Sequence, residues 1–160
     1  MSSPVFILTL ATALGCALVG GVFYAFSAFV MPALSRLNPA NGIAAMQAIN
    51  VTAVMPAFMT VFLGTGLACV ASIAVSIVQW GEGYPPYSLA GALLYLIGAI
   101  GVTGGFHVPR NNALAGMDPS TPPAAREWCR YLQAWTAGNH VRAAAALAAA
   151  GLMIGAVRLG

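Results

Sequence analysis

Charged residues are scarce in this chain of 160 residues: they make up 6% of it, lysine is absent, and only three residues are acidic. An ordinary soluble domain has about a quarter of its residues charged. Charge is missing from residues 1–35, 37–81 and 83–109, and each gap exceeds the ~20 apolar residues that a helix needs to cross a bilayer. The sequence therefore predicts an integral membrane protein in contact with the lipid bilayer.

The same scarcity excludes several classes of function. Nucleic-acid binding uses many cationic phosphate contacts, which six dispersed arginines do not supply. The acidic residues are too few and too far apart for a paired-carboxylate site, and no glycine-rich phosphate loop is present. Three cysteines without CxxC spacing and two histidines give no metal-binding signature. We therefore expect no metal and no nucleic-acid partner.

Four membrane spans fit the apolar runs, at about residues 5–30, 51–78, 88–106 and 136–157. Prolines punctuate the connections, and Pro122 suits the first turn of a helix that leads into the last span. Small residues in the spans would let the helices approach closely. The predicted fold is all-α: a single transmembrane domain over residues 1–160, built as an integral membrane four-helix bundle with a short extra helix before the last span.

The arginines predict the orientation. The first and third connections contain Arg36, Arg110, Arg126 and Arg130, whereas the second contains only Glu82. The positive-inside rule then places the first and third connections in the cytoplasm. We expect a bacterial inner membrane, and self-association into a homo-oligomer is an open alternative for so small a bundle.

Polar residues gather at the end of the bundle that holds the first and third connections. Unpaired polar groups are costly at membrane depth, so one shared polar cavity is the economical explanation. At about 100° per residue of helix, five side chains share an arc of about 80°: Trp128, Tyr131, Trp135, Asn139 and Arg142. This stripe predicts a slot for a flat aromatic ligand. The alternative is an interfacial aromatic belt with a buried arginine.

His140 falls on the opposite face of the same helix. It reaches the cavity only if the helix breaks at Gly138, in which case Asn139 would cap a new helix. A histidine buried inside the bundle for structural reasons is the alternative. The prediction of His140 as a site residue therefore depends on a break in the last span.

The third span is expected to end near Phe106. Pro109 has no backbone N–H and disfavours helical geometry at the residue before it. His107, Arg110 and Asn111 would then lie on irregular backbone beside the cavity. On the first two spans, Tyr24 and Asn50 are the preferred candidates for contact with a ligand, although either could simply bond one helix to another.

Taken in order, the motifs resemble those of the anthrone oxygenase-like family of small four-helix integral membrane proteins. They are "GGVFYAFSAFVMPAL" from Gly20, "AAMQAIN" from Ala44, "HVPRNNALAG" from His107, and "NHVR" from Asn139 preceded by Trp128 and Trp135. The family's usual pattern has asparagine in place of His107 and an apolar residue in place of Arg110. The resemblance covers nearly the whole chain.

The resemblance implies oxidation by O2 of an activated, phenol-flanked methylene, without a cofactor. His140 or His107 would then act as the base, and Arg142 would stabilise the developing oxyanion. The expected substrate-binding residues are Tyr24, Asn50, Arg110, Asn111, Trp128, Tyr131, Trp135 and Asn139. The expected partner is a small hydrophobic aromatic ligand, phenolic or quinone-like.

Two alternatives to this enzyme follow from the same residues. The first is a non-enzymatic membrane protein that binds a lipid or quinone, or an accessory subunit of a membrane assembly. The second is a haem held between His107 and His140, which requires the two imidazoles to face each other.

Overall fold

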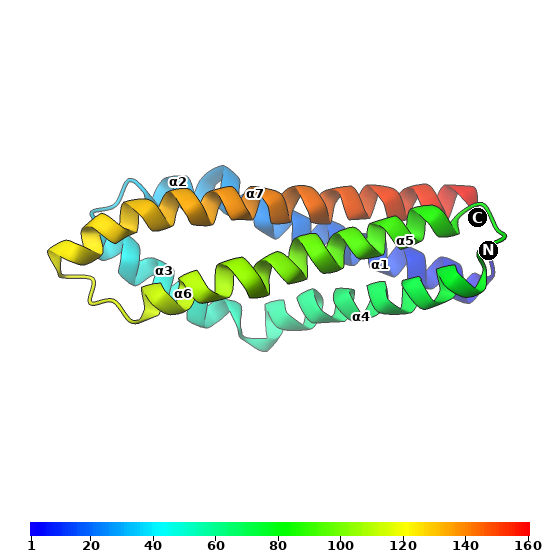
Figure 1. Cartoon of the computed structure of the whole chain (residues 1–160), viewed down its shortest axis with the longest axis horizontal. Coiled ribbons are helices and arrows are strands. Elements are labelled where there is room, and N and C mark those ends of the chain that lie inside the picture. The colour runs from blue at the N-terminus through cyan, green and yellow to red at the C-terminus, as the bar shows by residue number, and fades with distance from the viewer.

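The computed structural model describes residues 1–160, and its helices run side by side along one long axis (Figure 1). The α-helices are α1 (Ser3–Ala25), α2 (Met31–Leu34), α3 (Pro39–Ala53), α4 (Pro56–Val78), α5 (Pro85–Leu94), α6 (Val108–Ala115) and α7 (Pro122–Leu159). Three π-helical segments, η1 (Phe26–Val30), η2 (Tyr95–Gly101) and η3 (Thr103–His107), continue α1 and α5. Four helical stretches are long and apolar enough to cross a membrane, which confirms the all-α membrane bundle.

The helical stretches that are long and apolar enough to cross a membrane are Ser3–Leu34, Pro56–Val78, Pro85–Ala115 and Pro122–Leu159. The predicted start of the second span is wrong, because α3 ends at Ala53 and a separate helix begins at Pro56. Met55 between them is extended, with ψ at 155°, as expected for a residue before proline. The helix predicted to start near Pro122 is present and continues into the last span without interruption.

The predicted end of the third span near Phe106 is wrong. Val108 stays helical (φ −57°, ψ −48°), and its N–H donates to the carbonyl oxygen of Thr103. This π-helical turn is wider than an α-turn, so it relieves the clash that the ring of Pro109 would make with the preceding turn. His107, Arg110 and Asn111 therefore lie on a continuous helix and not on irregular backbone.

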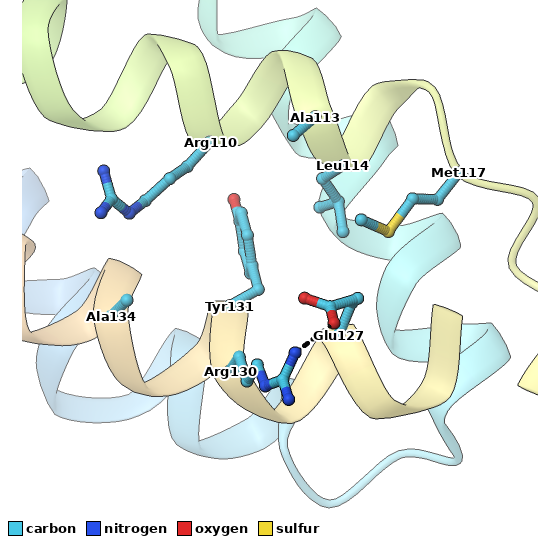
Figure 2. Close-up of a pocket in the computed structure, with 8 residues that line it drawn as sticks. All are labelled: Arg110, Ala113, Leu114, Met117, Glu127, Arg130, Tyr131 and Ala134. Atoms are coloured by element: carbon cyan, nitrogen blue, oxygen red, sulfur yellow. Dashed lines mark hydrogen bonds and ion pairs between the residues drawn. The ribbon is translucent and has the colours of Figure 1, made fainter. Parts of the chain in front are cut away.

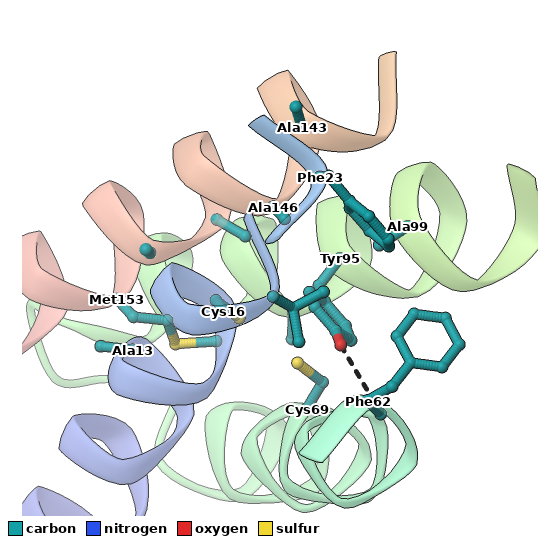
Figure 3. Close-up of a cluster of buried hydrophobic side chains, with 14 residues drawn as sticks. Ala13, Cys16, Phe23, Phe62, Cys69, Tyr95, Ala99, Ala143, Ala146 and Met153 are labelled. Atoms are coloured by element: carbon teal, nitrogen blue, oxygen red, sulfur yellow. Dashed lines mark hydrogen bonds between the residues drawn. The ribbon is translucent and has the colours of Figure 1, made fainter. Parts of the chain in front are cut away.

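Two apolar cores follow one another along the bundle. The first joins α1, α4, α5, η2 and α7, and Figure 3 shows its side chains, Cys16, Phe62, Cys69 and Tyr95 among them. The Tyr95 hydroxyl donates to the Phe62 carbonyl oxygen at 3.0 Å, so this phenol is satisfied inside the core. Cys16 and Cys69 are fully buried, as expected for small hydrophobic side chains.

Glycines let two helices pack tightly on α7. A Cβ added at Gly91 would lie 3.0 Å from the carbonyl oxygen of Ala149, and one at Gly20 would lie 2.8 Å from the Leu147 side chain. Contacts this short leave no room for a side chain. Small residues therefore do bring α1 and α5 against α7.

The second core forms a cap beyond the membrane bundle, made of α2, α3, α6 and residues 122–135 of α7. Its buried side chains are Met31, Leu34, Ile43, Met46, Leu114, Ala124, Trp128, Tyr131 and Trp135. With 38 residues, α7 is about 57 Å long, whereas the hydrocarbon core of a bilayer is ~30 Å thick. Because Arg126, Glu127 and Arg130 lie in its first turns, we expect this end of α7, and the cap packed on it, to extend beyond the hydrocarbon core.

Candidate functional site

A cavity of about 620 Å³ lies between the membrane bundle and the cap. Its walls come from α1, η1, the junction of α3 with α4, η3, α6 and α7, and its volume is typical of small-molecule sites. The wall is mostly apolar and includes the rings of Phe23, Phe26, Phe58, Phe62 and Trp135. Among the lining residues, only His107 and Arg142 have side chains that bind or release protons. These two residues therefore decide the acid and base chemistry that the cavity can perform.

Arg142 is a buried cation without a carboxylate partner. Its side chain is 6% exposed, and the structure has one ion pair, Arg130 with Glu127, which lies elsewhere. The guanidinium donates to Thr103 Oγ1 at 3.1 Å and to Asn139 Oδ1 at 2.7 Å, while its buried Nε has no partner. Buried charges are usually paired. The charge of Arg142 is thus free to interact with an anionic group in the cavity.

Two aromatic rings and an amide fix the position of this guanidinium. It lies 4.2 Å from the centroid of the Phe23 ring and 5.1 Å from that of Trp135, within cation–π range. Asn139 is fully buried, and its Nδ2 donates to the Phe23 carbonyl oxygen at 2.7 Å and to Ser27 Oγ at 2.8 Å. These bonds tie α7 to the region where α1 passes into η1, and π-helical turns are frequent at functional sites.

His107 is held by two main-chain carbonyls and one ring. Its Nε2 lies 3.2 Å from the Trp135 carbonyl oxygen and its Nδ1 lies 3.4 Å from that of Val102. The imidazole meets the Trp135 ring edge to face, with centroids 5.0 Å apart. A neutral imidazole carries one proton, and the shorter contact assigns it to Nε2. Nδ1 is then the nitrogen that can accept a proton.

Asn111 joins two side chains of the aromatic stripe. Its Oδ1 accepts hydrogen bonds from the Tyr131 hydroxyl at 2.9 Å and from Trp135 Nε1 at 3.0 Å. Tyr131 also stacks on Trp128, with ring centroids 5.6 Å apart. The amide of Asn111 therefore sets the orientation of the Trp135 ring, which lines the cavity.

Replacing Asn111 by leucine should lower the stability of the cap. The Tyr131 hydroxyl and Trp135 Nε1 would both lose their acceptor, and each buried donor left unpaired costs about 1–3 kcal/mol. Thermal unfolding in detergent, followed by tryptophan fluorescence, measures the effect. Asn112→Leu is the matched control, because the side chain of Asn112 is exposed and accepts neither of these two hydrogen bonds. An equal melting temperature for the two variants would contradict this function of Asn111.

The structure brings five of the predicted site residues to the cavity wall: Asn50, His107, Asn111, Trp135 and Arg142. Asn50 has a buried Nδ2 without a hydrogen-bond partner, so a second unsatisfied donor belongs to the cavity wall. Asn139 and Tyr131 lie behind the wall and bond to residues in it, and Trp128 packs inside the cap. All five residues of the predicted stripe are buried, which confirms that they share one face of α7.

Three predicted site residues lie outside the cavity. α7 runs unbroken through Gly138, so the predicted helix break is wrong and His140 is exposed. A haem held between His107 and His140 would require the two imidazoles to face each other. They do not, because His107 is buried and His140 is exposed. Tyr24 is 61% exposed on the outer face of α1.

Arg110 is the third predicted site residue that lies outside the cavity. It packs 3.5 Å from the centroid of the Phe106 ring and donates to the Phe106 carbonyl oxygen at 2.8 Å. It lines a smaller, separate cavity of about 190 Å³ beside Tyr131 and the Glu127–Arg130 pair (Figure 2).

Sequence reasoning missed Thr103 and the aromatic wall. Thr103 lies four residues before His107, a spacing that places both on one helix face, and this signal could have been used. Phe58 and Phe62 have the same spacing and stack with centroids 5.6 Å apart. Phe23 and Phe26 gave no signal, because phenylalanine is common in any membrane span.

The family model described as anthrone oxygenase matches residues 53–152, which is more than half of the 160 residues. The matched region contains α4 to α6 and most of α7, and with them His107, Asn111, Trp135 and Arg142. No curated protein and no solved structure matches the chain.

Proposed function

Because this chain belongs to the anthrone oxygenase family, we propose that it is a membrane oxidoreductase that uses O2 to oxidise a small hydrophobic aromatic. The substrate class is a phenolic compound with an activated ring methylene. The cavity between bundle and cap binds it, and the aromatic side chains of Phe23, Phe58 and Trp135 contact its flat faces.

The unpaired cation Arg142 is the observation that supports this proposal most directly. Removal of a proton from the methylene gives an enolate whose charge is delocalised onto the ring oxygen. A fixed guanidinium in an apolar cavity stabilises such an oxyanion far more than water does. The buried Arg142 Nε and Asn50 Nδ2, both without partners, offer hydrogen bonds to oxygen substituents of the ligand.

The reaction balances without a cofactor. The enolate passes one electron to O2, and the resulting superoxide and carbon radical combine into a peroxide anion, which takes up a proton to give a hydroperoxide. Loss of the second methylene proton then breaks the O–O bond. One oxygen atom stays in the new ketone and the other leaves as water, so one O2 is consumed per CH2 converted to C=O.

His107 is the proposed proton acceptor. It is the one base in the cavity wall, and its Nδ1 is the nitrogen with the longer carbonyl contact. An imidazolium at this position would have an acceptor for each of its two N–H groups, the carbonyl oxygens of Val102 and Trp135. Of the two histidines expected as the base, we choose His107 because His140 lies outside the cavity.

Oxygen consumption by the detergent-purified protein tests the proposal, with anthrone as substrate and anthraquinone absorbance as the product signal. Wild type and His140→Gln should consume one O2 per quinone formed. His107→Gln should be slower by about 10²–10⁴-fold, the usual contribution of a general base. Equal rates for wild type and His107→Gln would reject His107 as the base.

Binding without oxygen uptake would favour the alternative of a protein that binds a quinone or lipid, since the same donors suit the carbonyl oxygens of a quinone.

We further propose that the cap faces the cytoplasm. It and its loops contain Arg36, Arg110, Arg126 and Arg130, and the connection at the other end of the bundle has only Glu82.

A further inference from the structure

The cavity has a buried end and an exposed rim. At the buried end lie His107, Trp135 and Arg142, none of which is more than 6% exposed. The rim consists of lining residues that are themselves exposed: Ala48, Thr52, Val54, Met55, Ala57 and Val108. It therefore lies at the junction of α3 with α4 and at the first residue of α6.

The rim is apolar. Val54 is 69% exposed, Met55 55% and Val108 43%. The one hydroxyl, that of Thr52, donates to the Ala48 carbonyl oxygen at 3.0 Å and is thus already satisfied. No charged residue belongs to the rim. Exposed apolar surface is costly in water, at about 25 cal/mol per Å², but not in lipid.

The rim also lies at the level of the bilayer. Its residue Met55 directly precedes Pro56, where the membrane span Pro56–Val78 begins. That span of 23 residues is about 35 Å long, slightly more than the ~30 Å of the hydrocarbon core. The rim therefore meets the boundary between hydrocarbon and headgroups, where flat aromatic groups with a polar edge accumulate.

We propose that the cavity is loaded sideways from the bilayer, through a portal formed by Thr52, Val54, Met55 and Val108. The ligand is an aromatic compound dissolved in the membrane, and it reaches the buried end without passing through water. The ligand enters with its oxygen-bearing edge pointing toward Arg142. The identity of this ligand rests on the proposed function; the route rests on the rim alone.

Binding kinetics in lipid nanodiscs test the portal. The probe is 1,8-dihydroxyanthraquinone, which quenches tryptophan fluorescence and has no methylene left to oxidise. Val54→Phe narrows the portal and should lower the association and dissociation rates at least tenfold each, so that Kd changes by less than twofold. Val51→Phe is the matched control: Val51 is 65% exposed in the last turn of α3, just before Val54, but does not line the cavity. It should bind at the wild-type rate.

A second variant covers the case in which Val54→Phe fails to fold. Val108→Ala widens the portal and should raise both rates.

Equal association rates for Val54→Phe, Val51→Phe and Val108→Ala would overturn the portal. Probe binding with these differences, but no oxygen uptake with anthrone, would overturn the proposed function and leave the portal standing. Failure of the wild type to bind the probe would overturn both.

Discussion

Arg142→Met is expected to slow oxygen uptake severely and, at the same time, to make the protein more stable. The guanidinium is buried without a carboxylate, so the folded chain carries the cost of its desolvation. Methionine keeps an unbranched stem of similar length beside Phe23 and Trp135. Replacing even a buried ion pair by apolar groups is often neutral or stabilising by about 1–4 kcal/mol, and Arg142 has no carboxylate partner to offset its desolvation. Each kcal/mol raises the melting temperature by roughly 2–4 °C in a chain of this size.

The loss of turnover should be about 10²–10³-fold, as for the removal of one donor to an oxyanion. Oxygen consumption and thermal unfolding in the same detergent measure both effects. Arg158→Met is the control, because Arg158 is exposed at the far end of α7 and should change neither. A variant that keeps wild-type uptake would show that Arg142 does not stabilise the reacting anion. A variant that is inactive and less stable would point to a structural function for the charge.

Gly138→Ala should damage both the fold and the site. A Cβ at this position would lie 2.7 Å from Phe106 Cδ1 and 2.9 Å from His107 Cε1. The imidazole cannot retreat without lengthening its contact with the Trp135 carbonyl oxygen, and Arg110 packs on the Phe106 ring. Overpacking of this kind costs about 1–3 kcal/mol. A shift of His107 by about 1 Å can lower turnover by as much as 10²-fold.

Gly151→Ala on the same helix is the matched control for this substitution. Nothing lies within 4 Å of a Cβ added at Gly151, so the change should stabilise α7 by about 1 kcal/mol through helix propensity alone. The melting temperatures of the two variants should therefore move in opposite directions, and oxygen uptake should fall only in Gly138→Ala. Parallel behaviour would mean that the close approach of His107 to Gly138 matters little.

The membrane bundle and the stripe on α7 could be predicted because helical geometry converts spacing into direction. Trp128, Tyr131, Trp135, Asn139 and Arg142 share one face of any straight helix, and the structure buries all of them. The same arithmetic placed His140 on the opposite face, where it is found. The error lay in expecting Gly138 to break the helix, since the glycine instead makes room for Phe106 and His107.

The prolines show what the sequence could not decide. Met55 before Pro56 is extended, whereas Val108 before Pro109 is helical. Both residues precede a proline, and the difference comes from the π-helical turn η3, which spacing and composition did not indicate. The contacts of His107 with Val102 and Trp135 depend on that turn and on the approach of α7. Their geometry therefore required the structure.

Tyr24 illustrates a different limit. It lies four residues after Gly20, a spacing that places both residues on one side of a helix. Gly20 is buried, but the buried face of α1 continues through Phe23 and leaves Tyr24 exposed. In a span that is apolar all round, lipid-facing and core-facing positions look alike, and a single tyrosine does not mark the inner side.

The continuous helix α7 links the depth of Arg142 to the thickness of the membrane. The charge-free stretch 143–157 between Arg142 and Arg158 is about 22 Å long, shorter than the ~30 Å hydrocarbon core. If Arg158 extends to the far interface, hydrophobic mismatch draws Arg142 below the near one. We then expect a thick bilayer to destabilise the ligand-free protein and an anionic ligand that neutralises Arg142 to relieve this penalty. On the proposed function, acyl-chain length should therefore change how tightly the cavity holds its ligand.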